Sequence, residues 1–275
     1  MRGTVVSNSS TGNNISLAGK NSLVTGSTSG IGLGIARRLA ECGANVMVNG
    51  LGDRDLVDAA VRAVDDAGPG QVVFSPANMI QPVEIAAMVE DAVDSFGSID
   101  ILVNNAGIQF VSPIQDFPPE KWDDIIAINM SSSFHTIRAA TPHMIAAGWG
   151  RIINISSLHA LVASPYKAAY VAAKHGVAGL TKVVALELAQ KNITVNSIAP
   201  GYVETPLVTG QVADTARARG ITEEEVVRDV MLAAQPTKKF IQIDEIANMV
   251  IFLCSDAAAS ITGAILPVDG GWSAQ

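Results

Sequence analysis

The amino-acid sequence predicts a single-domain α/β protein, a doubly wound parallel sheet of about seven strands with helices on both faces. Short apolar runs alternate with stretches of helical periodicity from Lys20 onward, as strands and crossover helices do in such a sheet. The 275 residues are 48% hydrophobic but only 5% aromatic, a composition that suits a buried parallel sheet with closely packed helices and one large core.

The predicted elements follow one another without an internal repeat or an inter-domain linker. Strands are expected at 21–25, 45–49, 72–75, 100–104, 151–155, 193–198 and 264–268. Helices are expected at 31–42, 53–67, 81–96, 120–147, 167–190, 222–234 and 244–254. The segment 205–239 interrupts this alternation, and excursions of this size usually cap a site. We therefore expect a mobile lid there.

Composition also limits the partners and the location. Residues 1–16 are rich in Ser, Asn, Thr and Gly, so we expect a disordered extension followed by one domain at 17–275. The net charge of −8 and the lack of a basic stripe argue against nucleic acid, and no apolar run reaches the length of a membrane span. Cys42 and Cys254 lie in apolar helical patterns, which indicates buried free thiols, a reducing compartment and, most simply, the cytoplasm.

A glycine loop joins the first strand to the first helix. Gly26 permits a sharp turn, while Gly30 and Gly32 allow the backbone to approach a pyrophosphate, whose charge the helix N-terminus favours. The spacing is Gly-x-x-x-Gly-x-Gly rather than the common Gly-x-Gly-x-x-Gly, and a simple tight turn is the alternative. The order of strand, loop and helix favours a Rossmann-type dinucleotide site.

Two later strand ends add to this site. Small residues at Asn105, Ala106 and Gly107 leave room for an adenosine ribose, although a plain strand-end turn would look the same. Pro200-Gly201 follows the sixth strand, and the hydroxyl of Thr205 could hold a nicotinamide carboxamide.

Tyr170 and Lys174 are four residues apart, so on a helix they share one face. A cation close to a phenol favours the phenolate and lowers the phenol pKa from its usual value near ~10. An amphipathic helix with a snorkelling lysine would show the same spacing. The pair is a candidate acid–base catalyst because of the motifs that accompany it.

Taken together, these motifs resemble the short-chain dehydrogenase/reductase family, and the resemblance covers residues 17–275. It implies that Tyr170 is the general acid/base, that Lys174 lowers the Tyr170 pKa and binds the nicotinamide ribose, that Ser157 hydrogen-bonds the substrate oxygen, and that Asn129 holds a water behind Lys174. Ser156 is the adjacent candidate for the serine role, and spacing favours Ser157. The nicotinamide cofactor carries the hydride, so no metal is required.

The resemblance also implies a set of cofactor contacts. They are Gly26, Thr28, Gly30, Ile31, Gly32, Leu51, Asn78, Asn105, Ala106, Gly107, Tyr170, Lys174, Pro200, Gly201, Val203 and Thr205. Many members that prefer NAD place an Asp after the second strand, where this chain has Gly50. No Arg follows that strand immediately, although Arg54 is near, so NAD is favoured over NADP. Asn78 replaces an Asp that usually meets adenine, and its amide can donate and accept.

The final third of the chain is most similar to the D-3-hydroxybutyrate dehydrogenase subfamily. Its matching stretches are Pro206-Leu207-Val208, 230–238 and 267–272. The resemblance implies that the substrate carboxylate is held by Gln109, His159, Lys167 and Gln211. It also implies that Tyr202 and Trp272 wall the methyl end, although Trp272 could serve packing alone. Each polar residue has an ordinary surface or loop role as its alternative. A cation beside amide and imidazole donors suits a carboxylate.

The implied activity is the reversible, NAD-dependent oxidation of (R)-3-hydroxybutyrate to acetoacetate. Another family member, such as a 3-oxoacyl-carrier-protein reductase or a sugar-alcohol dehydrogenase, is the enzyme alternative. The acidic balance argues against the carrier-protein reductase, which needs a basic patch. A non-catalytic NAD-binding redox sensor would be expected to lack Tyr170 or Lys174, and both are present. Family members are usually tetramers, so we expect a homotetramer that associates through the helices at 120–147 and 167–190 and the last strand.

Overall fold

The computed structural model describes residues 15–274, so the disordered extension predicted for 1–16 lies almost wholly outside the described residues. A seven-stranded sheet in the order β3-β2-β1-β4-β5-β6-β7 forms the centre of the fold. Every strand pair is parallel. The strands are β1 (Asn21–Val24), β2 (Asn45–Asn49), β3 (Val72–Ser75), β4 (Ile101–Asn104), β5 (Gly150–Ile155), β6 (Ile193–Pro200) and β7 (Ile265–Val268). The predicted fold class is confirmed, and all seven strands were placed correctly apart from small shifts at their ends.

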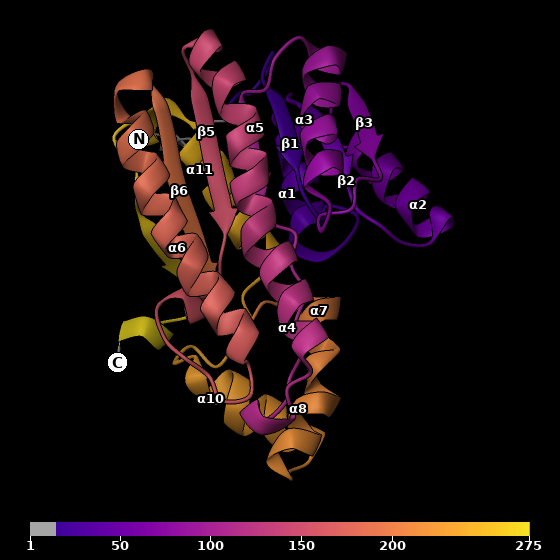
Figure 1. The fold of residues 1–275 in the computed structure, drawn as a ribbon, viewed down its shortest axis with the longest axis vertical. Coiled ribbons are helices and arrows are strands. Elements are labelled where there is room, and N and C mark those ends of the chain that lie inside the picture. The colour runs from indigo at the N-terminus through magenta and orange to yellow at the C-terminus, as the bar shows by residue number, and fades with distance from the viewer. Residues whose placement is uncertain (1–14, 275) are drawn as a thin grey trace, which may run out of the picture.

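Helices cover both faces of the sheet (Figure 1). One face carries α1 (Gly30–Glu41), α2 (Arg54–Asp65) and α11 (Ile243–Cys254), and the other carries α3 (Pro82–Phe96), α5 (Ser132–Ala147) and α6 (Ala168–Leu188). Neighbouring strand residues point to opposite faces, so Val24 packs into the core under α1 and α11 while Leu23 packs into the core under α3 and α5. Both side chains are fully buried, which contributes about 1.5–3 kcal/mol each.

The helix predicted at 120–147 contains a π-helical turn. It consists of α4 (Pro119–Ile126), the π turn Ala127–Ser131 and then α5. The π turn carries Asn129, which is buried. Such turns occur often at functional sites because they shift the side chains by one position within a helix. No residue type indicates a π turn, so the sequence predicted the helix but not the π turn within it.

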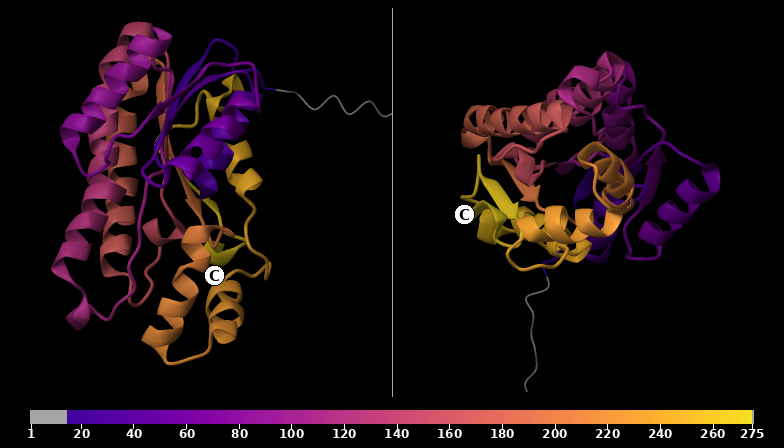
Figure 2. Two further views of the ribbon diagram at one scale, coloured as in Figure 1. Left: turned by 90° about the vertical axis from the view of Figure 1, so that its right-hand side faces the viewer. Right: turned by 90° about the horizontal axis from the view of Figure 1, so that it is seen from below.

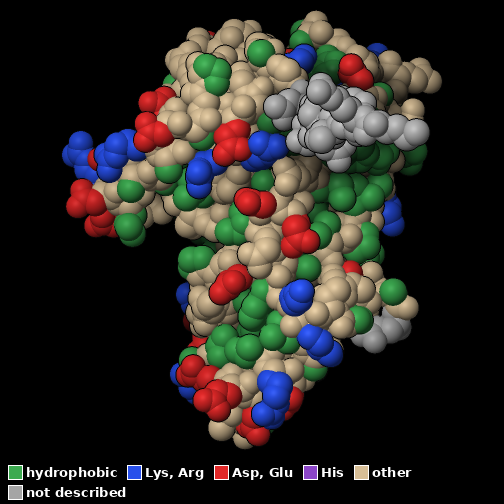
Figure 3. Space-filling model, turned by 180° about the vertical axis from the view of Figure 1, so that it is seen from behind, with side chains coloured by type: hydrophobic (Ala, Val, Ile, Leu, Met, Phe, Trp, Pro, Cys, Tyr) green, Lys and Arg blue, Asp and Glu red, His purple; other side chains and the backbone are tan. Residues whose placement is uncertain are grey.

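The predicted lid segment is a helical excursion beneath the sheet (Figure 2). It contains α7 (Pro206–Thr209), α8 (Gln211–Arg219), α9 (Glu223–Glu225), a second π turn at Val226–Met231 and α10 (Leu232–Ala234). The sequence predicted the helical stretch 222–234 but not α7 and α8. Gly210 lies between these two short helices. Figure 3 shows charged side chains of both signs over this lower end of the molecule.

Both ends of the excursion meet at one point. Val203 and Ile241 form an isolated parallel bridge, and the Ile241 N–H donates to the Tyr202 carbonyl at 2.9 Å. Gln235 is fully buried and accepts from the Tyr202 N–H while it donates to the Lys239 carbonyl. These bonds hold the base of the segment, so any motion has to occur in the helices beyond it.

The remaining helical pieces are single 3₁₀ turns. They lie at Ile114–Asp116, Leu158–Ala160, Ala189–Lys191, Asp256–Ala258 and Trp272–Ala274. Among residues 15–274, no helix is long and apolar enough to cross a membrane. Over the same range, no group of three or more His, Cys, Asp or Glu could hold a metal ion.

A buried polar network ties α5 and α6 to the sheet. The Asn104 amide donates to the Asn154 side chain at 2.9 Å, and the Asn154 amide donates to the Thr181 hydroxyl at 2.9 Å. On the other side the Thr136 hydroxyl donates to Asn104 at 2.6 Å. All four side chains are buried, so each needs these partners. The network fixes α6 against the ends of β4 and β5.

Replacement of Thr181 by Val is expected to lower the free energy of unfolding by about 1–3 kcal/mol, because the buried Asn154 amide loses its acceptor. Urea unfolding at fixed protein concentration would measure the change. Lys182→Ala, at the exposed neighbouring position, is the control and should shift the free energy by less than about 0.5 kcal/mol. Equal stabilities of Thr181→Val and the parent protein would contradict a structural role for the network.

Candidate active site

A cavity of about 340 Å³ lies at the carboxyl ends of the strands, where the loops after β1 to β6 and the excursion meet. Strand order reverses between β1 and β4, and in open parallel sheets such a switch point is the usual ligand site. Every site residue predicted from the sequence lines this cavity except Gly32 and Asn129. Residues that lie far apart in the sequence are therefore brought together.

The glycine loop forms a cradle at the N-terminus of α1. Gly26 has φ +60°, and a Cβ there would lie 2.8 Å from the Ala106 Cα. Gly30 has φ +54°, which also favours glycine. Ser29, the N-cap of α1, makes no side-chain cap hydrogen bond. The free N–H groups of this helix end and the close backbone approach suit the pyrophosphate of a dinucleotide.

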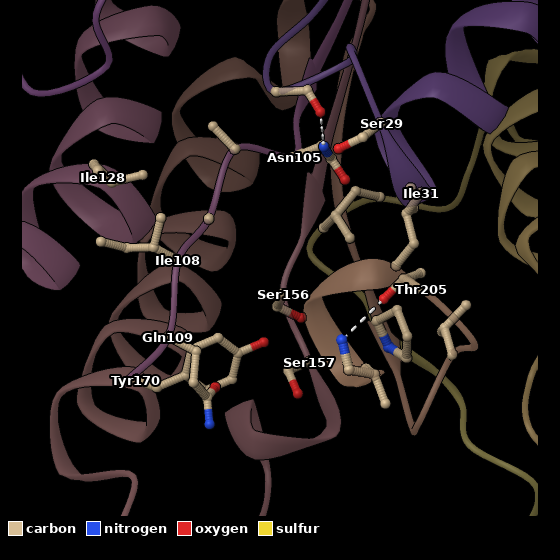
Figure 4. Close-up of a pocket in the computed structure, with 18 of the residues that line it drawn as sticks. Ser29, Ile31, Asn105, Ile108, Gln109, Ile128, Ser156, Ser157, Tyr170 and Thr205 are labelled. Carbon is tan, nitrogen blue, oxygen red and sulfur yellow. Dashed lines mark hydrogen bonds between the residues drawn. The ribbon is translucent and has the colours of Figure 1, made fainter. Parts of the chain in front are cut away.

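Asn105 joins the glycine loop to the loop after β4. Its side-chain amide donates to the carbonyls of Thr25 at 3.0 Å and Gly26 at 2.9 Å (Figure 4). In return, the Thr25 hydroxyl accepts from the Asn105 N–H at 3.0 Å. A Cβ on Gly32 would lie 2.4 Å from the Asn105 amide nitrogen. Gly32 thus supports the loop from below, which explains why it does not line the cavity.

The end of β2 shows why this chain has Gly50 where many relatives in the resembled family have Asp. A Cβ on Gly50 would lie 2.5 Å from the Thr28 hydroxyl oxygen, so a larger side chain would displace Thr28. Leu51 beyond it is exposed. The Arg54 side chain is 92% exposed and lies 3.9 Å from the Asp58 carboxylate, away from the cavity lining.

Asn78 lies at the adenine end of the predicted cofactor site. Its side-chain oxygen accepts from the Ile80 N–H at 3.1 Å, and its own N–H donates to the Glu84 carboxylate at 2.8 Å. The residue is therefore held in place by its neighbours. Its side chain remains part of the cavity lining.

Lys174 is buried and donates to the Ile155 carbonyl at 2.9 Å. Its ammonium lies 5.5 Å from the centre of the Tyr170 ring. Figure 4 shows the Tyr170 hydroxyl directed toward Ser156 and Ser157, which follow β5. The side chains of Ser157 and Tyr170 are hydrogen-bonded. The expected phenol, hydroxyl and ammonium thus share one corner of the cavity.

Asn129 lies behind this corner. Its side-chain oxygen accepts from the Ile108 N–H at 2.8 Å, and its amide donates to the Ile108 carbonyl at 2.9 Å. The π turn therefore holds the loop after β4, which passes over the cavity and carries Gln109. In this structure Asn129 positions backbone rather than facing the cavity directly.

The two adjacent serines are distinguished by their partners. Ser156 donates to the Ile198 carbonyl at 3.0 Å and accepts from the Ser197 hydroxyl at 2.6 Å, so it belongs to the β5–β6 contact. Ser157 accepts from the His159 N–H at 3.1 Å, which leaves its own hydroxyl hydrogen available to Tyr170. The geometry therefore favours Ser157 for contact with a substrate oxygen.

Burial dominates the electrostatics of the Tyr170 corner. It raises the pKa of Tyr170, and the hydrogen bond with Ser157 lowers that pKa in part. Burial also lowers the pKa of Lys174 to about 8. The sequence led us to expect that Lys174 would depress the Tyr170 pKa. In the protein alone the ammonium instead interacts with the Ile155 carbonyl, and desolvation of the phenol outweighs its effect.

A cluster of aromatic and polar side chains lies next to the Tyr170 corner, since the rings of His159 and Tyr170 are 6.2 Å apart. The Lys167 ammonium donates to the Gln211 side-chain oxygen at 3.2 Å and lies 5.4 Å over the Tyr202 ring. Tyr202 stacks on Trp272 at 5.4 Å, and Trp272 meets His159 edge-on at 5.6 Å. The predicted substrate residues form one wall.

Two polar atoms of this wall have no hydrogen-bond partner among the described residues. They are the Gln109 amide nitrogen and the His159 Nδ1, and both are buried. Burial and the neighbouring Lys167 lower the pKa of His159 to about 4, so the imidazole is neutral at pH 7. Burial, together with the positive charge of Arg219, lowers the pKa of Lys167 to about 8. Buried groups of this kind require a polar ligand.

Further residues that line the cavity were not predicted. They include Ser29, Asn49, Met79, Ile108, Ile128 and Val208. Ser29 lies inside the glycine loop and Ile108 follows Gly107, so position in the sequence could have indicated both. The apolar side chains carry no chemical signal and are brought to the site by the fold alone.

A model of the family described as enoyl-(acyl carrier protein) reductase matches residues 26–273. The chain belongs to the short-chain dehydrogenase/reductase family. It is 59% identical over 256 residues to a D-beta-hydroxybutyrate dehydrogenase of Rhizobium meliloti, covering 93% of this chain and 99% of that protein. Over 260 residues it is 54% identical to a D-beta-hydroxybutyrate dehydrogenase of Cupriavidus necator, covering 94% and 100%.

A solved structure has the same fold. It comes from Agrobacterium tumefaciens, is provisionally described as a 2-deoxy-D-gluconate 3-dehydrogenase, and contains bound NADP. Its TM-score is 0.81 at 36% sequence identity, with 96% of this chain and 100% of that chain covered. Membership of this dehydrogenase family implies a nicotinamide cofactor, and the glycine cradle described above fits one.

Gly26→Ala is expected to weaken NADH binding by at least about tenfold, because the new methyl group meets Ala106 in a backbone conformation that favours glycine. Titration of NADH fluorescence would measure the affinity. Gly179→Ala on α6 is the control, since nothing lies within 4 Å of its added Cβ. An unchanged NADH affinity in Gly26→Ala would show that the loop does not hold the dinucleotide.

Proposed function

We propose that this protein catalyses the reversible oxidation of (R)-3-hydroxybutyrate to acetoacetate with NAD. The observation that carries the proposal is the wall of Lys167, Gln211, His159 and Gln109 in the same cavity as Tyr170. Relatives named D-beta-hydroxybutyrate dehydrogenase, 59% and 54% identical over nearly the whole chain, support it.

The substrate carboxylate is proposed to bind at this wall. A buried ammonium provides charge, and the buried Gln109 amide nitrogen and His159 Nδ1, which lack partners among the described residues, provide further hydrogen-bonding groups in the same cavity. Hydrogen bonds between charged groups are shorter and stronger than neutral ones, which favours a carboxylate over an uncharged hydroxyl. Tyr202 and Trp272 stack beside it and leave an apolar surface for the methyl end.

The alcohol is proposed to bind beside this wall, against Ser157 and Tyr170. Ser157 would orient the alcohol oxygen, and the Tyr170 phenolate would accept the hydroxyl proton as the carbonyl forms. Bound oxidised nicotinamide supplies the hydride acceptor. The hydrogen bond with Ser157 counters part of the effect of burial on the Tyr170 pKa. The buried ammonium of Lys174 would add to this by stabilising the phenolate as it forms.

NAD rather than NADP is proposed as the cofactor. A 2′-phosphate requires a nearby cation, and Arg54 is almost fully exposed and lies beside Asp58. Neither Gly50 nor Thr28 supplies a carboxylate that could bind the adenosine ribose. The proposed preference for NAD over NADP therefore depends on the lack of an Arg or Lys, among the described residues that line this end of the cavity, to bind a 2′-phosphate.

We also propose that the segment 205–239 is a lid, that the protein is cytoplasmic and that it assembles as a homotetramer. Phe134 on α5 and Leu186 on α6 expose apolar side chains, which supports association through these helices. The lid proposal is supported by the Val203–Ile241 bridge, which brings the two ends of the segment together.

The purified protein is expected to reduce NAD with (R)-3-hydroxybutyrate, and NADP at a rate at least about tenfold lower. Tyr170→Phe should lower kcat by about 10²–10⁴-fold because the proton acceptor is lost. Its NADH affinity, measured by fluorescence, should stay within a factor of about two. Absorbance at the NADH band would follow turnover on a panel of hydroxy acids and sugar alcohols. If the protein oxidised another alcohol but not 3-hydroxybutyrate, the proposed substrate would be rejected, and the assignment to the dehydrogenase family would still hold.

The KM for 3-hydroxybutyrate is expected to rise as the pH increases through about 8, the pKa of Lys167. Lys167 is charged below this pH and neutral above it, so the carboxylate loses its cationic partner as the pH rises. The KM is then expected to increase by up to about tenfold per pH unit. Bound substrate raises the Lys167 pKa, so the rise in KM begins near pH 8 and continues until the pH reaches the higher pKa of the complex. Initial-rate kinetics between pH 7 and 9.5 would separate KM from kcat. Lys167→Met should have a high KM that does not vary with pH, and a flat KM in the parent protein would contradict the role.

A further inference from the structure

Arg219 is a second cation near the carboxylate wall, and it comes from the excursion rather than from the body. It is the last residue of α8, and Gln211, the partner of Lys167, is the first. Gln211, Thr215 and Arg219 are spaced by four residues, so they share one face of the helix. Gln211 and Thr215 are buried, which shows that this face turns toward the body.

The position of Arg219 differs from that of the other arginines in the excursion. Arg217 lies 2.9 Å from the Asp214 carboxylate, and Arg228 lies 2.6 Å from that of Asp229. Arg219 makes no ion pair among the described residues, and its Nε is buried without a hydrogen-bond partner there. A guanidinium has five donors and usually uses several of them. Arg219 thus carries an uncompensated charge at the inner face of the excursion.

Its guanidinium lies 5.7 Å over the ring of Tyr166, the residue directly before Lys167. Tyr166 has φ +69°, a conformation that costs a non-glycine residue free energy, and its carbonyl accepts from the Ser112 N–H at 2.9 Å. The ring is therefore presented by a fixed loop. The positive charge of Arg219 reaches the cavity wall: burial lowers the Lys167 pKa and Arg219 adds to that effect, whereas burial raises the Tyr202 pKa to about 12 and Arg219 offsets part of the rise.

We propose that Arg219 is a specificity-determining residue whose charge, added to that of Lys167, selects anionic substrates from the excursion side of the cavity. The inference rests on the proposed function and deepens it. The charges of Lys167 and Arg219 repel each other while the cavity is empty, and a carboxylate between the body and the excursion removes that repulsion. An uncharged alcohol gains nothing from Arg219.

The variants Arg219→Gln and Arg219→Lys separate charge from packing, and Arg217→Gln is the matched control on the outer face of the same helix. Acetoacetate with NAD cannot react, so calorimetric titration of the protein–NAD complex measures anion binding without turnover. Arg219→Gln is expected to weaken acetoacetate binding about fivefold, as for a charge acting across a partly screened distance. Arg219→Lys and Arg217→Gln should stay within a factor of about two.

Steady-state kinetics give the second readout. In Arg219→Gln the KM for 3-hydroxybutyrate should rise by the same factor of about five, with kcat and NADH affinity unchanged. The amide of the same hydroxy acid, which has no charge, should show no change in kcat/KM. An equal loss for the amide, or an Arg219→Lys variant as weak as Arg219→Gln, would overturn the inference in favour of packing on Tyr166.

The two proposals fail in different ways. Turnover of 3-hydroxybutyrate with identical acetoacetate affinities in the parent and Arg219→Gln would reject the role of Arg219 and keep the proposed function. Absence of turnover with anion binding that still depends on Arg219 would reject the reaction and keep the inference. A parent protein that neither turns over 3-hydroxybutyrate nor binds acetoacetate would reject both.

Discussion

The hydrogen bond from the buried Lys174 ammonium to the Ile155 carbonyl is the contact on which the site depends. It joins α6 to the end of β5, two residues before Ser157, and so sets the position of Tyr170 relative to that serine. An ammonium without water is costly, and a single carbonyl compensates only part of that cost. The part of the desolvation cost that the carbonyl does not compensate lowers the pKa of Lys174. The fold therefore keeps a cation in an environment that favours proton exchange.

One stretch of chain carries two lysines with different environments. Lys167, the residue before α6, and Lys174 are seven residues apart, which is about two helical turns, so both face the cavity. Lys174 contacts a backbone carbonyl of the body, whereas Lys167 contacts Gln211 of the excursion. Burial lowers both pKa values to about 8, yet the proposed mechanism uses the charge of Lys174 for proton transfer and that of Lys167 for substrate binding.

Sequence alone predicted the sheet and most helices, and all but two of the site residues that it named line the cavity, because glycine positions and strand–helix alternation are local signals. It could not predict α7 and α8, since Gly210 divides a helical stretch too short to show periodicity. The reason for Gly50 lies in its contact with Thr28, which is distant in sequence. The sequence also could not predict that the pKa of Tyr170 is raised, because burial of the phenol depends on the whole fold. Arg219 belongs to no recognised sequence motif, and only its contacts in the structure indicate a role for it.

The residues proposed to recognise the substrate also lie at the contact between the body and the excursion. The excursion is fixed at its base by the Val203–Ile241 bridge, and its first helices carry Thr205, Gln211 and Arg219. The body supplies Lys167, so the bond between Lys167 and Gln211 links the two parts directly. A ligand that takes over this bond changes the contact between body and excursion at the same moment as it is recognised. In the proposed mechanism, any movement of the excursion would respond to the charge of the substrate, because Lys167 and Gln211 meet at the boundary where the carboxylate is proposed to bind.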